Sequence, residues 1–191
     1  MGRQVTTYVH CDVETYSAAD LTRVGAHQYA RDPSTHCLMI AWQEDDAVFG
    51  LGPVNLCDLT SGSSTGIPGE LRFLLDDRDV TFCAFNASFE MAIFEHRLGV
   101  KFDPSRWLCV QALALSYGLP GSLGGVGNAL GLKGDKAKSD DGKKLIKRFS
   151  MPQKDGRRIM PEDSPQEWAQ FCEYCRRDVV AEHEIFKRLP L

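Results

Sequence analysis

The chain has 191 residues, of which 43% are hydrophobic and 25% charged, the composition of an ordinary globular protein. No apolar run approaches the roughly 20 residues of a membrane span, and the N-terminal "MGRQVTTYVH" lacks the apolar core of a signal peptide. Seven scattered cysteines fit a reducing compartment better than a disulfide framework. We therefore expect one domain over residues 1–191, located in the cytoplasm and without a membrane partner.

The net charge of −4 argues against a protein that coats nucleic acid by charge alone, but the charge is unevenly distributed. Residues 133–158 carry ten Lys or Arg and four Asp, a balance of +6, which leaves −10 for the rest of the chain. This segment is the one obvious place for the phosphates of a polyanion. For residues 133–141 a solvated charged loop is an equally good interpretation. The nucleic-acid-binding candidates in this segment are Lys143, Lys144, Lys147 and Arg148.

Strand patterns come first along the chain. Residues 5–13 and 36–43 are predicted strands, and a short third strand at 47–51 follows the turn-like residues 44–46. These three strands predict an antiparallel meander. A loop rich in Gly and Ser follows, at residues 59–70.

The second half of the chain is mostly helical in pattern. A short helix at 70–75 leads into a buried strand at 80–86, and a helix at 86–99 begins with Asn86 as its N-cap. Residues 122–132 repeat apolar side chains at helical spacing. Early strands followed by helices on one sheet indicate an α/β or α+β architecture.

The clearest helix covers residues 164–186. Ser164 is its predicted N-cap, Pro165 its first residue and Glu167 the acid of a capping box. Cys172 and Cys175 form a CxxC on this helix, but without a second pair they are predicted to be packing residues.

Two carboxylates, Asp12 and Glu14, lie one residue apart at the end of the first predicted strand. Side chains alternate between the faces of a strand, so these two share a face with Tyr8 and His10. Like charges this close repel each other unless a cation lies between them. A lone Asp-x-Glu is more often a solvated strand end than a metal site, so further carboxylates must decide.

Further oxygen ligands occur at two later positions. Glu90 falls in the first turn of the helix that follows the buried strand. Tyr174 and Asp178 are four residues apart, so they lie on one face of the last predicted helix. Four carboxylates with no accompanying set of His or Cys ligands suit hard cations such as Mg²⁺ or Mn²⁺.

Three segments carry a resemblance to a known family: "VHCDVET" at 9–15, "AFNASFE" at 84–90 and "YCRRD" at 174–178. In order and spacing they resemble the three motifs of the DEDD superfamily in its tyrosine variant, the proofreading 3′–5′ exonucleases. "SLGGVGNALGL" and "GKKLIKRFS" resemble the N-terminal exonuclease region of phage-type family A DNA polymerases. The similarity extends from about Tyr8 to Leu189. It implies an α/β, ribonuclease-H-like fold, with a mixed five-stranded sheet flanked by helices.

The resemblance also implies two-metal hydrolysis of phosphodiester bonds, with two Mg²⁺ or Mn²⁺ ions as cofactors. Asp12 would bridge the two ions, Asp178 would complete the shell of the first, and Glu90 would hold the second through water. Glu14 and Tyr174 would orient the attacking water. The superfamily usually has Asp at the position of Glu90, so this carboxylate is displaced by about one bond length.

The implied substrate is DNA with a single-stranded or frayed 3′ end, in a bacterial or phage-infected host cell. Thr15, Phe85 and Asn86 flank the carboxylates closely enough to contact the terminal nucleotide. The polymerases continue beyond this region, so the chain is either a free-standing nuclease, with a DNA polymerase as a partner in trans, or an excised domain. Two alternatives stay open, a 3′–5′ exoribonuclease of the same superfamily and an inactive nucleic-acid-binding module. The presence of all four acids and the tyrosine disfavours the inactive module.

Overall fold

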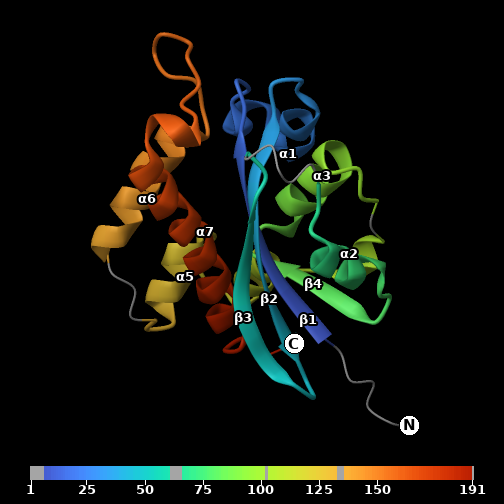
Figure 1. Ribbon diagram of the computed structural model, residues 1–191. Coiled ribbons are helices and arrows are strands. Elements are labelled where there is room, and N and C mark those ends of the chain that lie inside the picture. Colours follow the sequence, from blue (N-terminus) through green and yellow to red (C-terminus); the bar gives the residue numbers. More distant parts are fainter. Residues whose placement is uncertain (1–6, 61–65, 102, 133–135, 191) are drawn as a thin grey trace.

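A central five-stranded sheet carries helices on both faces in the computed structural model (Figure 1), which describes residues 7–60, 66–101, 103–132 and 136–190. The strands are β1 (Thr7–Tyr16), β2 (His36–Asp46), β3 (Gly50–Asp58), β4 (Val80–Ala84) and β5 (Trp107–Cys109). The helices are α1 (Leu21–Arg31), α2 (Gly69–Asp76), α3 (Ala87–Arg97), α4 (Val110–Ser116), α5 (Leu123–Ala129), α6 (Lys136–Phe149) and α7 (Pro165–Phe186). Within these residues, no helix is both long and apolar enough to cross a lipid bilayer.

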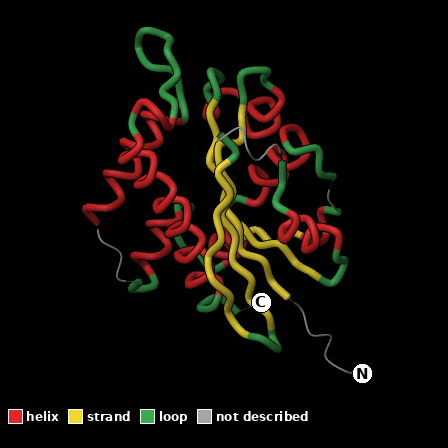
Figure 2. The backbone as a smooth tube through the Cα atoms, in the orientation of Figure 1, coloured by secondary structure: helices red, strands yellow, loops and turns green. Residues whose placement is uncertain are grey.

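The strand order in the sheet is β3-β2-β1-β4-β5. Strands β1, β2 and β3 are antiparallel neighbours, with α1 connecting β1 to β2 and a short turn connecting β2 to β3, whereas β4 and β5 run parallel to β1. Figure 2 shows the strands in yellow between two groups of helices. The expected ribonuclease-H-like class, a mixed five-stranded sheet flanked by helices, is therefore confirmed, as is the antiparallel meander at its start.

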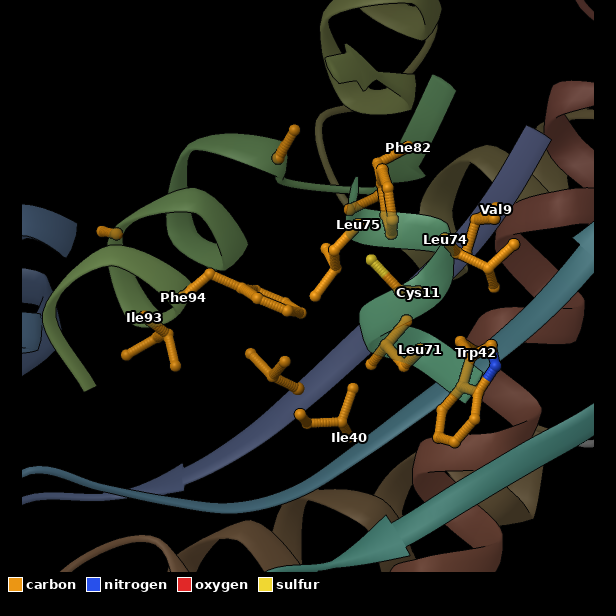
Figure 3. Close-up of a cluster of buried hydrophobic side chains, with 14 of the residues drawn as sticks. Val9, Cys11, Ile40, Trp42, Leu71, Leu74, Leu75, Phe82, Ile93 and Phe94 are labelled. Atoms are coloured by element: carbon orange, nitrogen blue, oxygen red, sulfur yellow. The ribbon is translucent and has the colours of Figure 1, made fainter. Parts of the chain in front are cut away.

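One face of the sheet packs against α1, α2 and α3. Figure 3 shows this core, in which Val9 and Cys11 of β1 and Ile40 and Trp42 of β2 lie beneath the helices. Phe94 of α3 is fully buried in the same cluster. Because side chains alternate along a strand, the β1 residues between these apolar ones face the other layer, which contains α7.

The opposite face packs against α6 and α7, with α5 beside them (Figure 1). Phe171 and Cys175 of α7 are completely buried against β2, and Leu145 and Phe149 anchor α6 to the same cluster. Burying a side chain of this size contributes about 1.5–3 kcal/mol. The packing role of Cys175 was expected from the sequence.

Strand boundaries differ from expectation, and the third strand covers Gly50–Asp58 rather than residues 47–51. Residues 44–46 are not a turn, because β2 continues to Asp46 and the chain reverses at residues 47–49. The side chain of Asp46 accepts hydrogen bonds from the backbone N–H groups of Val48 and Phe49, and these bonds stabilise the turn at residues 47–49. The first strand runs beyond residue 13, so the two acids lie inside it rather than at its end. Residues 5 and 6 of that predicted strand lie outside the described residues.

The capping contacts of α7 and the start of α6 also differ from expectation. The predicted capping box on α7 does not form, because Arg148 of α6 binds the side chains of both Ser164 and Glu167. Ser164 Oγ accepts from Arg148 Nη2 at 2.6 Å, and Glu167 Oε2 pairs with Arg148 Nε at 2.6 Å. The interpretation of residues 133–141 as a loop is wrong for 136–141, which begin α6. Residues 133–135 and 61–65 lie outside the described residues.

Candidate functional site

Asp12 and Glu14 lie in the C-terminal half of β1, which pairs with β2 but not with β4. The pairing of β1 with β4 ends where His10 lies opposite Cys83, and the chain from β4 then turns into α3. The pairing with β2 continues past both acids on the other side. The two carboxylates therefore face α7 at the place where the sheet opens between β1 and β4.

Glu90 comes to this opening from α3. It lies in the first turn of that helix, is only 4% exposed, and its Oε2 has no hydrogen-bond partner within the described residues. Tyr174 and Asp178 come from α7, which crosses this face of the sheet (Figure 1). The Tyr174 hydroxyl and the Asp178 carboxylate are close enough to influence each other's pKa.

The pKa values show that the four carboxylates act on one another. Burial is the largest cause of the raised pKa of Glu14, and Asp12, Asp178 and Glu90 add to it through their charges. Burial likewise raises the pKa of Asp12 and of Glu90 well above the ordinary value. Burial raises the pKa of Asp178 to about 6, although the neighbouring Tyr174 hydroxyl opposes the shift.

No Lys or Arg side chain in the described part of the chain forms an ion pair with any of these four carboxylates. The neutral thiol of Cys175 does contact the cluster, with its Sγ 3.4 Å from Oδ2 of Asp12. Four acids brought together from a strand and two helices must hold either protons or cations to coexist. Oxygen ligands alone suit hard divalent cations.

The predicted nucleotide contacts differ in accessibility. Thr15 is 5% exposed, and its hydroxyl hydrogen-bonds to the hydroxyl of Tyr29 at 2.8 Å. Phe85 is half-buried in the cluster beneath α4 and α5. Asn86 is exposed beside the start of α3, where its Oδ1 accepts from Ser88. Of the three, Asn86 is the residue most open to a ligand.

The basic residues of α6 also differ in their partners. Arg148 is held by α7, as described above. Lys144 pairs with Asp141 at 3.1 Å, but both side chains are largely exposed. Lys143 and Lys147 are exposed on the same helix.

Sequence reasoning missed Gly142. This α6 residue is buried, and a Cβ built on it would overlap the ring of Tyr174. A glycine within a helix is the signal that could have revealed it. Such a glycine lowers the stability of the helix, and the close approach of another side chain can explain why it is there. Cys175 was recognised only as a packing residue, and its contact with Asp12 was also missed.

No model of a protein family matches the chain. The chain is 35% identical over 184 residues to the DNA polymerase of Bacillus phage SP02, a match that covers 93% of this chain and 27% of the polymerase. A solved structure described as the apo form of the nuclease has 15% identity and a TM-score of 0.47, covering 96% of this chain and 70% of that one. Brucella melitensis NrnC with bound Mg²⁺ has 16% identity and a TM-score of 0.42, covering 95% of this chain and 74% of that one. Structural likeness at this level does not by itself indicate a function. The chain spans about a quarter of the length of the polymerase. The predicted resemblance to phage-type DNA polymerases is therefore confirmed, and the chain is homologous to a segment of such an enzyme.

Proposed function

We propose that residues 1–191 form one metal-dependent 3′–5′ exonuclease domain of the DEDD superfamily, which hydrolyses DNA from its 3′ end. The observation that carries this proposal is the cluster of four carboxylates, gathered from β1, α3 and α7, without a Lys or Arg ion pair among the described residues. Homology to a phage DNA polymerase supports DNA as the substrate.

The oxygen ligands of the four carboxylates suit divalent cations, and we propose two of them. Asp12, Glu14, Glu90 and Asp178 would hold them, and the unpartnered buried Oε2 of Glu90 is a free oxygen ligand of the kind required. Such ions, when bound, activate the attacking water and stabilise the leaving 3′ oxygen. Mutual repulsion within the cluster disfavours the charged carboxylates without cations, which supports a site built to bind them.

The chain's own residues then set the geometry around the scissile bond. The pKa of Tyr174 is raised, mainly by burial, so its phenol keeps its proton at neutral pH. The ring is held by Gly142 on one side and by a stacking contact with Phe171, and its hydroxyl is near Asp178. A hydroxyl fixed in this way can orient a water molecule. The thiol of Cys175 similarly restrains Asp12.

The substrate strand would approach past the exposed start of α3. Asn86, which is exposed, would contact the terminal nucleotide, and Phe85 precedes it in the chain. A contact from Thr15 would require its hydroxyl to leave Tyr29, so we assign Thr15 a backbone or packing role at this edge. The exposed lysines of α6 would bind phosphates further along the strand.

The test uses oligonucleotides of one sequence as single-stranded DNA, duplex DNA and RNA, each labelled at the 3′ or 5′ end. With Mg²⁺ or Mn²⁺ we expect stepwise loss from the 3′ end of single-stranded DNA. EDTA should stop it, and so should Asp12→Ala. The control Asp76→Ala removes an exposed acid of α2, so it should cleave like the wild type.

Three results would contradict the proposal: cleavage that survives EDTA, full activity of Asp12→Ala, or no cleavage by the wild type. Faster cleavage of RNA than of DNA would favour the exoribonuclease. Strand binding without cleavage in either ion would favour the inactive binding module.

A further inference from the structure

A second polar cluster lies on the same face of the sheet as the carboxylates, but nearer the start of β1. It contains His10 of β1, Asp45 of β2, and Glu182 and His183 of α7. Its members come from three elements that pack together (Figure 1). His10 and Glu182 are almost completely buried, and so is His183.

Two hydrogen bonds organise this cluster. His10 Nδ1 lies 2.6 Å from Oε2 of Glu182, and His183 Nε2 lies 3.1 Å from Oδ2 of Asp45. The two imidazole rings meet edge to face, with their centroids 4.6 Å apart. One ligand atom from each of His10, Asp45 and His183 lies within 4.8 Å of those of the other two.

The unusual atom is Nε2 of His10. The side chain is 0% exposed, and Nε2 has no hydrogen-bond partner within the described residues. Because Nδ1 is hydrogen-bonded to Glu182, Nε2 is the ring nitrogen left for a further partner. A carboxylate that fixes a histidine through one nitrogen, so that the other can bind a metal, is the usual outer arrangement of zinc-ligating histidines.

We propose that His10, Asp45 and His183 bind one transition-metal cation of the Zn²⁺ type, with Glu182 orienting His10 from behind. Two imidazole nitrogens with one carboxylate oxygen form a ligand set that suits Zn²⁺, whereas Mg²⁺ prefers oxygen ligands alone. Ligand atoms around tetrahedral Zn²⁺ are about 3.4 Å apart. The distance of 3.1 Å between Asp45 Oδ2 and His183 Nε2 is already close to this spacing. Small side-chain rotations would bring the ligand atom of His10 to the same spacing from the other two.

The site also has an entry path and an open position. The Asp45 side chain is 32% exposed, whereas the histidines behind it are buried. A cation can therefore enter past Asp45 and keep a water as its fourth ligand.

This site differs in ligand chemistry from the four carboxylates and does not depend on the proposed nuclease activity. His10 precedes Asp12 by two residues on one strand face, so the two sites are about 7 Å apart along β1. A bound cation would join the end of β2 to α7 and would hold α7 over the sheet. The competing explanation is a pair of purely structural hydrogen bonds, between His10 and Glu182 and between His183 and Asp45.

The experiment measures zinc bound to the full chain by mass spectrometry after equilibration with Zn²⁺ in excess Mg²⁺, which occupies sites made only of oxygen ligands. We expect one zinc per chain and a higher melting temperature with zinc than without it. Asp45→Asn should weaken zinc binding by at least about tenfold, because even the loss of a residue that only hydrogen-bonds to a metal ligand costs about this much affinity. The control Glu44→Gln changes the neighbouring carboxylate on β2 and should bind zinc like the wild type.

Two further variants keep the test decisive. His183→Gln should lose zinc as Asp45→Asn does, and circular dichroism should show both folded before zinc is added. Asp12→Ala should retain its zinc, because it changes only the carboxylate cluster. The proposal is overturned if the wild type binds no zinc, if Asp45→Asn and His183→Gln bind it as tightly, or if Asp12→Ala abolishes binding.

Discussion

The ring of Tyr174 lies against Gly142 in space that only a glycine leaves free. A Cβ at residue 142 would lie 2.8 Å from Cδ2 of the ring and 3.1 Å from Cζ. On α7 itself the ring stacks with Phe171, with the planes 16° apart. Two helices therefore determine where the phenol points.

Gly142→Ala should lower the rate of cleavage by about tenfold or more, because a shift of the reacting group by an ångström costs this much. Alanine favours the helix by about 1 kcal/mol, but crowding costs about 1–3 kcal/mol. The melting temperature should therefore change little or fall slightly. The measurement is the rate on labelled single-stranded DNA at saturating Mg²⁺.

The matched control for this variant is Gly124→Ala in α5, where a Cβ meets no atom within 4 Å. If Gly142 acts through the Tyr174 hydroxyl, adding Gly142→Ala to Tyr174→Phe should cost almost nothing more, because coupled residues are not additive. Wild-type activity in Gly142→Ala would show that the ring position is not critical.

Tyr174→Phe should slow hydrolysis and leave metal binding intact, because the phenol orients water without being a required ligand. The ring contacts with Phe171 and Gly142 stay, so the melting temperature should be unchanged. Calorimetric titration with Mn²⁺, run beside the cleavage assay, checks both halves. An unchanged rate would reduce Tyr174 to a packing residue of α7.

Glu90→Asp should reduce the rate in Mg²⁺ by about tenfold or more, although it restores the usual residue of the superfamily. Glu90 is buried in the first turn of α3, so the backbone cannot easily move to compensate for a shorter arm. Mg²⁺ demands near-ideal geometry, whereas Mn²⁺ should tolerate the gap better. A Mg²⁺ rate at or above wild type, with a lower ratio of Mn²⁺ to Mg²⁺ activity, would mean that Glu90 is the compromise.

The free energy of unfolding of the metal-free protein should fall as the pH rises. Burial raises the pKa of Asp178 from 3.8 to about 6, so the folded state binds this proton more tightly than the unfolded state. Stability from this group is full below about pH 4 and is lost as the pH passes about 6. The raised pKa values of Asp12, Glu14 and Glu90 extend the loss in the same direction.

Melting temperatures in EDTA, measured from acid to neutral pH, check this dependence. Asp178→Asn should have the shallower decline, because it removes one titrating group. Mg²⁺ should raise the melting temperature most at neutral pH, where the carboxylates are charged. Equal slopes for wild type and Asp178→Asn would count against the carboxylate cluster as their source.

The basic face of α6 should supply non-specific affinity for nucleic acid. Changing Lys143, Lys144 and Lys147 to Gln should weaken binding to all sequences alike, and each lost contact should flatten the logarithmic salt dependence by about 0.7 on single strands. Arg148→Gln is the comparison, since Arg148 already pairs with α7 and should affect stability more than the salt slope. An unaltered salt slope in the triple variant would mean that these lysines are merely solvated.

Much of the fold followed from local patterns. The alternation in β1, the buried β4 and the apolar stripe of α7 each predicted their element, because one face of each is buried in a core. The same patterns put Asp12 and Glu14 on one strand face and Tyr174 with Asp178 on one helix face. Their meeting with Glu90 was implied only by the family resemblance.

The remaining features depend on contacts between distant segments. Arg148 of α6 binds the two side chains that were predicted to form the capping box of α7. The sequence around the cap gives no sign of this contact, because Arg148 lies in another helix. The helix α1 went unpredicted, and Gly25 inside it has a φ of 76°, which breaks the helical pattern. The three-residue strand β5 is too short to show a period. Nothing local indicated that Asp45, taken for part of a turn, would meet His183.

The contact between Cys175 and Asp12 joins residues 163 positions apart. Closing so long a loop is among the slower events in folding, because the entropy is lost before the contact is gained. Until α7 docks, the sheet and α3 can present three carboxylates but neither the phenol nor the fourth acid. Under the proposed function, a chain in which α7 has not yet docked would lack a complete site and could not attack nucleic acid.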